Sequence, residues 1–130
     1  MTTTTDTLSD LARRLLDQPV HATVSSIEPD GTVQLSLVWV TRDGDDVLLS
    51  TLAGRRKARN WTRDPRATVL LFDPHDTGRY AEIRGQVTLV DDPGGSLIHE
   101  LADAYDDAPF TGVIDGRVIV RLTPERVVTR

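Results

Sequence analysis

From His21 onward the chain repeats one pattern, in which apolar and polar residues alternate over short runs that turn-forming residues separate. Alternation with a period of two places successive side chains on opposite faces of a β-strand. The pattern predicts six strands: His21–Glu28, Thr32–Thr41, Asp46–Thr51, Ala67–Phe72, Arg79–Asp91 and Arg117–Thr123. Val127 and Val128 can extend the last strand past Pro124, so the expected number of strands is six or seven.

Three segments change to helical spacing. The spacing predicts helices over Leu8–Asp17, Leu52–Asp64 and Ser96–Tyr105, and a proline soon after each of the first two helps to end it. Because strands dominate and hairpin turns join most of them, we expect a mainly β chain with a few helices. A small antiparallel barrel is the economical arrangement, since closing a sheet removes its exposed edges.

A length of 130 residues fits one domain spanning residues 1–130, with residues 1–7 expected to form a disordered tail. The absence of cysteine excludes disulfides, thiolate metal sites and a cysteine nucleophile. No apolar run approaches the roughly 18 residues of a membrane span. The N-terminus lacks the basic and apolar regions of a secretory signal, so the sequence predicts a cytoplasmic protein without a membrane partner.

One short segment, Leu52–Arg66, carries six cationic side chains and a single carboxylate, a net charge of +5 in a chain whose total is −5. A concentrated basic segment in an acidic protein is either a solvated helix face or a place where an anionic ligand collects. A nucleic-acid site is disfavoured, because such sites usually show an extended basic stripe or stacking aromatic residues.

The position of the cations favours the anion site. Arg55, Arg56 and Lys57 stand where the predicted helix begins, and the helix dipole makes a cation there unfavourable by about 0.3–1 kcal/mol. A bound anion would compensate for this cost, and the free N–H groups of a helix start suit a phosphate. Ser50 and Thr51, at the end of the preceding strand, can add hydroxyl donors.

No set of catalytic or metal-ligating side chains stands out. His21, His75 and His99 are widely spaced and show no metal-ligand pattern, which indicates structural or exposed roles. Ser50 has no evident base partner, so a hydrolase is not indicated. We therefore expect no metal and no catalytic side chain, which is typical of enzymes whose cofactor carries the chemistry.

The segment Ser50–Ala67, with Arg-Lys-Ala-Arg-Asn at 56–60 followed by Asp-Pro-Arg at 64–66, resembles the signature of the pyridoxamine 5'-phosphate oxidase-like split β-barrels. The similarity extends from about His21 to Val128. Within the family, this version is most similar to the branch that binds the deazaflavin coenzyme F420. The resemblance implies a split β-barrel, a homodimer, and a cofactor in a groove between the subunits.

One departure from the family bears on the choice of cofactor. In the flavin-dependent oxidases, the strand before the signature carries an arginine and, five residues later, a lysine, and both serve the FMN site. Leu35 and Val40 occupy the matching positions here. The resemblance therefore implies F420 rather than FMN, with FMN as the alternative.

The resemblance also assigns the cofactor-binding residues. Those expected at the phosphate are the pair Arg56 and Lys57, with the hydroxyls of Ser50 and Thr51 beside it. Arg55 is expected to join them on the phospholactyl or poly-glutamate portion of the cofactor. Those expected near the ring or further along the cofactor are Leu37, Val38, Trp39, Asn60 and Tyr80. Two of the aromatic residues, Trp39 and Tyr80, have a competing interpretation as core or core-edge side chains, as does Trp61, since large aromatics mainly supply buried area.

The implied activity is an F420H2-dependent reductase that transfers hydride to an electron-poor small-molecule acceptor, with a final proton from Tyr80 or from water. Two alternatives remain open at this point. The chain could be an FMN-binding protein of the same fold, or a non-catalytic F420-binding carrier, because a fold does not determine a function.

Overall fold

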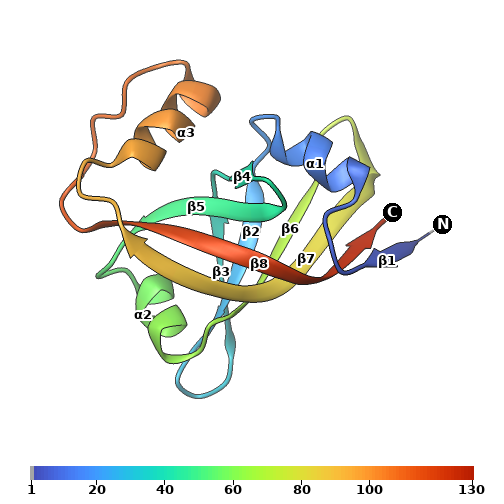
Figure 1. Ribbon diagram of the computed structural model, residues 1–130, viewed down its shortest axis with the longest axis horizontal. Helices are drawn as coiled ribbons and strands as arrows, with labels where there is room; N and C mark the ends of the chain where they lie inside the picture. The colour runs from blue at the N-terminus through green and yellow to red at the C-terminus, as the bar shows by residue number, and fades with distance from the viewer. Residues whose placement is uncertain (1) are drawn as a thin grey trace.

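The computed structural model describes residues 2–130, and Figure 1 shows a curved antiparallel sheet with three helices around it. The strands are β1 (Thr3–Thr5), β2 (Ala22–Ile27), β3 (Val33–Val38), β4 (Thr41–Asp43), β5 (Asp46–Leu52), β6 (Arg66–Asp73), β7 (Asp76–Asp91) and β8 (Arg117–Thr129). The helices are α1 (Asp10–Leu16), α2 (Arg56–Arg63) and α3 (Ser96–Asp106). None of the helices in this part of the chain is both long and apolar enough to cross a membrane.

The sheet has the strand order β3-β2-β6-β7-β8-β5-β4, with β1 paired to β8, and every pair is antiparallel. The two outermost strands of this order, β3 and β4, follow one another in the chain and are separated only by Trp39 and Val40. The sheet must therefore curl until its edges approach each other. The predicted mainly β class and the split-barrel arrangement are confirmed.

Alternate residues of the strands fill the interior. Val24, Val69, Ile83 and Val120 are almost completely buried, as their alternation predicts. Trp61, on α2, is only 2% exposed, and its indole N–H donates to the backbone oxygen of Ser25 at 3.2 Å. The interpretation of Trp61 as a core residue is therefore right.

The N-terminal residues differ from the expectation of a disordered tail at residues 1–7. Thr3–Thr5 form β1 and pair with Val127–Thr129 at the end of β8. The hydroxyl of Ser9, which caps α1, also lies 2.7 Å from that of Thr129. The reason for the correction is that β8 continues past Pro124 and offers an unpaired edge. Residue 1, also part of the predicted tail, lies outside the described residues.

The long strands β7 and β8 stay paired past Pro124 because of a glycine. The register shifts between Arg84 and Gly85, and Gly85 lies opposite Pro124. A Cβ atom on Gly85 would stand 2.0 Å from the backbone oxygen of Thr123. This closeness allows only a hydrogen at that position, so Gly85 permits the bend of the two strands.

The substitution Gly85→Ala should destabilise the fold by about 1–3 kcal/mol, the usual cost of forcing extra atoms into a packed interior. Gly94→Ala is the matched control, because a Cβ at Gly94 would meet nothing within 4 Å. Urea unfolding followed by tryptophan fluorescence measures both. Equal midpoints for the two variants would contradict the close approach at Gly85.

Over most of β3 the apolar side chains lie on the exposed face of the sheet, and the polar residues Gln34 and Ser36 lie on the half-buried face. At the end of the strand, Val38 and the nearby Val40 are buried in the interior. Val33, Leu35 and Leu37 share the other face and are 62%, 63% and 77% exposed. The structure thus leaves an apolar row of side chains at one edge of the sheet without a partner among residues 2–130.

Candidate functional site

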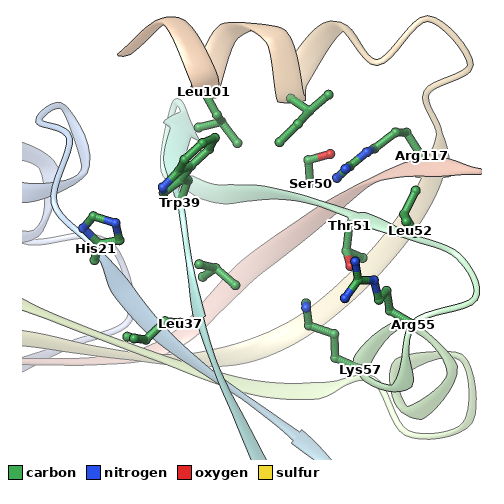
Figure 2. A pocket seen from close by; sticks show the side chains of 12 residues that line it. His21, Leu37, Trp39, Ser50, Thr51, Leu52, Arg55, Lys57, Leu101 and Arg117 are labelled. Atoms are coloured by element: carbon green, nitrogen blue, oxygen red, sulfur yellow. The ribbon is translucent and has the colours of Figure 1, made fainter. Parts of the chain in front are cut away.

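A cavity of about 480 Å³ lies where β3 ends, beside β5, the start of α2 and the underside of α3 (Figure 2). Five predicted residues that line it come from β5 or from the end of β3: Leu37, Val38, Trp39, Ser50 and Thr51. Two more, Arg55 and Lys57, come from the start of α2. The structure therefore brings together seven of the ten expected site residues.

The cavity has a cationic end, formed by Arg55, Lys57 and Arg117. Arg55 is the residue that precedes the first turn of α2, and its side chain does not cap the helix. Arg117 begins β8 and lies opposite Leu52 in the β5–β8 ladder. This pairing brings Arg117 beside a segment more than sixty positions earlier in the sequence.

No carboxylate among residues 2–130 lies within 4.0 Å of these three cations. Burial lowers the pKa of the Lys57 ammonium, and the nearby charges of Arg55 and Arg117 lower it further. Burial and the charge of Arg55 also lower the pKa of Arg117. The charged forms are thus destabilised in the free protein, and an anion at this end of the cavity would relieve the repulsion.

Arg117 is held in place from its far side. Its Nε donates a hydrogen bond to the backbone oxygen of Val113 at 2.8 Å, and its guanidinium carbon lies 4.9 Å from the centre of the Phe110 ring. Both partners belong to the loop between α3 and β8. A cation that is positioned before a ligand arrives loses less entropy when the ligand binds.

Ser50 supplies a further sign of a missing ligand. Its hydroxyl oxygen is buried and has no hydrogen-bond partner within the described part of the chain. Buried polar groups without a partner are rare and costly, so each requires an explanation. Because Ser50 lines the cavity beside Thr51 and Arg117, a ligand oxygen there would satisfy it (Figure 2). The residues present therefore fit a phosphorylated cofactor.

The other end of the cavity is aromatic. Trp39 stacks on Tyr105 of α3, with 5.3 Å between the ring centres, and His21 meets the same tyrosine edge-on at 5.5 Å. The Tyr105 hydroxyl accepts from the backbone N–H of Val40 at 3.0 Å and can donate to the backbone oxygen of Val20 at 2.8 Å. Burial raises the pKa of Tyr105. Tyr105 thus fixes the end of α3 to the segment before β2 and to the connection between β3 and β4.

Three expected site residues lie away from the cavity, which corrects their expected placement. Arg56 points to the β2–β3 turn, where its guanidinium lies 3.6 Å from the Glu28 carboxylate. Asn60 is buried and donates to the Ser26 hydroxyl at 3.0 Å, so it is a packing residue. Tyr80 lines a separate hollow on β6 and β7. The helical period explains the placement of Arg56, since it and its neighbour Lys57 face different sides of α2.

Sequence reasoning missed four cavity residues outside the signature: His21, Ile98, Leu101 and Arg117. His21 was expected to be structural or exposed, and it is an exposed residue on the cavity wall. A single Arg at position 117 gives no local signal of a site. Only the pairing of β8 with β5 reveals it.

Replacing Lys57 by methionine should stabilise the ligand-free protein at neutral pH by about 0.3–1 kcal/mol, the cost of a cation at a helix N-terminus. The folded-state pKa of Lys57 lies below its unfolded value, so the wild type gains stability as pH rises from the folded to the unfolded pKa. The advantage of Lys57→Met should therefore shrink toward alkaline pH.

Urea denaturation at several pH values measures this difference. Lys57→Arg is the control, because it keeps a charge that does not titrate in this range and should show no recovery at alkaline pH. A Lys57→Met variant that is less stable than the wild type at neutral pH would contradict the unfavourable placement of the charge.

Comparison with known proteins agrees with this fold. Residues 8–130 match the family of pyridoxamine 5'-phosphate oxidase. The protein is thus of the class of split barrels related to flavin- and deazaflavin-dependent oxidoreductases. The chain belongs to the pyridoxamine 5'-phosphate oxidase family, and the resemblance stated from the sequence is confirmed. The comparison with curated proteins finds no match.

Several solved structures share the fold. One described as an F420 reductase is 32% identical, with a TM-score of 0.82, and the alignment covers 88% of this chain and 94% of that chain. A conserved hypothetical protein from Mycobacterium tuberculosis is 25% identical, with a TM-score of 0.72 and coverage of 94% and 84%. General Stress Protein 26 from Bacillus anthracis, at 14% identity, a TM-score of 0.70 and coverage of 88% and 86%, shows the fold alone.

Proposed function

We propose that this protein is an F420H2-dependent oxidoreductase that reduces an electron-poor small-molecule acceptor. The observation that carries the proposal is the group of three unneutralised cations around the unpaired Ser50 hydroxyl. Arg55, Lys57 and Arg117, with Ser50 and Thr51, would hold the phosphate and its neighbouring carboxylates. The similarity to a structure described as an F420 reductase supports the same cofactor.

When bound and reduced, the deazaflavin supplies a hydride. The residues of this chain bind and orient it. Leu37, Val38 and Trp39 provide an apolar wall on which a flat ring can lie, and Ile98 and Leu101 of α3 cover the cavity from above. Such a wall excludes water from the ring and leaves the charged part of the cofactor at the cationic end.

FMN is the alternative cofactor, and the placement of two residues disfavours it. By resemblance, the FMN-binding oxidases use cations at the positions of Leu35 and Val40. Here Leu35 points outward from β3 and Val40 is buried in the core. Neither position contributes a charge to the cavity. The cationic side chains that line the cavity are Arg55 and Lys57 at the start of α2 and Arg117.

The test of the cofactor is a direct comparison of binding affinities. F420 should bind more tightly than FMN in a fluorescence titration, and Lys57→Ala should weaken F420 binding more than tenfold. Arg56→Ala is the matched control from the same helical turn, and it should change the affinity less than twofold because Arg56 pairs with Glu28. Tighter binding of FMN, or equal losses for the two variants, would contradict the assignment.

We also propose that the functional unit is a homodimer, with the cofactor at the subunit interface. The exposed apolar row of Val33, Leu35 and Leu37 supports this, together with Leu70 and Phe72 of β6, which are also exposed. β2 separates β3 from β6 in the sheet, so these side chains belong to one broad surface. Leu37 also lines the cavity, and a second copy would therefore complete its open side.

Leu35→Glu should convert the dimer to a monomer, because a charge in an apolar interface remains unpaired. Light scattering coupled to size-exclusion chromatography measures the mass. Val90→Glu places the same charge on an exposed valine of β7 outside this surface and should leave the dimer intact. A wild-type protein that is monomeric at micromolar concentration would refute the dimer.

A carrier that binds F420 without turnover is the second candidate function. Screening electron-poor alkenes, quinones and tetrapyrroles with F420H2, and following oxidation of the cofactor, separates the two. Turnover of any acceptor supports the enzyme, whereas tight binding of F420 without turnover across the panel supports the carrier. The cytoplasmic location expected from the sequence stays a prediction.

A further inference from the structure

Reduction of a polar double bond requires a proton as well as a hydride. The proposed function supplies the hydride from the cofactor, and the sequence suggested Tyr80 or water for the proton. The structure places Tyr80 on β7 in a separate hollow, away from the cavity. Within one subunit, the proton must then come from a residue that lines the cavity or from solvent.

Most polar groups of the lining are unsuited to this step. Arg55 and Arg117 keep their protons at any physiological pH, and alcohol groups such as those of Ser50 and Thr51 do not ionise there. Lys57 lies at the cationic end, beside the groups that would hold the phosphate. Of the residues from 2 to 130 that line the cavity, His21 is the one whose side-chain type exchanges protons near neutral pH.

His21 also lies at the appropriate end of the cavity. Figure 2 shows His21 on the opposite side from Arg55, Lys57 and Arg117, with Leu37 and Trp39 between them. A cofactor whose charged part binds the cations would place its ring over Leu37 and Trp39. An acceptor that lies on this ring would then come next to the His21 imidazole.

The position of His21 is supported by its neighbours. Its ring packs edge-on against Tyr105, at 5.5 Å between centres, and the Tyr105 hydroxyl is hydrogen-bonded to the backbone of Val20 and Val40. His21 is nevertheless exposed, so solvent can return a proton after each turnover. A catalytic acid needs both a defined position and a route for reprotonation.

We propose that His21 is the catalytic acid of this reductase, an inference that rests on the proposed function. In the reaction, the acceptor's C=X bond gains a hydride at carbon from the reduced deazaflavin, and the π electrons move to X. X then takes a proton from the His21 imidazolium, which becomes neutral. The acceptor gains a hydride and a proton, the cofactor loses the hydride and releases one ring proton to solvent, and solvent restores the imidazolium.

The first experiment locates His21 without requiring turnover. The full-length protein labelled with 15N and 13C in histidine is titrated with oxidised F420, and imidazole signals are assigned with His21→Gln, His75→Gln and His99→Gln. The His21 signal should shift on binding, and that of His75, in the exposed β6–β7 turn, should not. An unchanged His21 signal in an F420-saturated protein overturns the proposal.

The second experiment tests the proton transfer. With F420H2 and 2-cyclohexen-1-one, or the best alkene of the acceptor screen, His21→Gln should lower kcat at least tenfold and leave the F420 dissociation constant within threefold of wild type. Added imidazole should restore part of the rate. His75→Gln is the control, with unchanged kcat and unchanged affinity.

The pH profile separates a catalytic from a structural role. The pH dependence of kcat should differ between the wild type and His21→Gln, because only the wild type carries an imidazole at this position. The other ionisable groups around the cavity are Tyr105 from α3, Arg55 and Lys57 from α2, and Arg117 from β8. These remain in the variant, so any pH dependence that persists there belongs to them.

The outcomes distinguish the two proposals. A wild type that turns over the alkene while His21→Gln does so equally well refutes the role of His21 alone. A wild type that binds F420 but reduces no acceptor refutes the reductase and the catalytic acid together. A thermal melt of each variant confirms that the comparison is made on folded protein.

Discussion

The pairing of β8 with β5 is the interaction on which the site depends. The ladder sets Thr51 opposite Val118 and Leu52 opposite Arg117, and the backbone N–H of Ala53 extends it by donating to Gly116 at 2.8 Å. This register brings a cation from the end of the chain to the hydroxyls and cations of the β5–α2 junction. A change of one residue in register would turn Arg117 to the other face of the sheet.

The cationic end of the cavity shows why binding residues can reduce stability. Three positive charges gather without a carboxylate partner among the described residues, and burial disfavours the charged form of Lys57. Elsewhere in residues 2–130, six arginines are paired with a carboxylate, among them Arg13 with Asp45 and Arg42 with Asp17. The three cavity cations differ in that they lie together around a cavity, where a negative ligand would provide the missing charge.

The two ends of the cavity are built by different physical means. At the cationic end, the sheet register and the loop around Phe110 fix the position of Arg117. At the aromatic end, one hydroxyl of α3 holds the helix to the backbone at Val20 and Val40, and Trp39 and His21 pack against the same ring. A cavity whose ends are both rigid can orient an extended cofactor that is charged at one end and flat at the other.

The sequence by itself determined the long strands, the three helices and the basic start of α2, because alternation, proline positions and helical spacing are local properties. Lys57 and Ser50 could be predicted from their signature, whereas Arg56 and Asn60 could not be separated from them without the orientation of α2. Only the tertiary structure decided that Arg117 and His21 share a cavity with Trp39, since strand pairing and the docking of α3 join residues that are far apart in the chain. It also decided that Thr3–Thr5 form a strand, because their partner lies at the opposite end of the sequence.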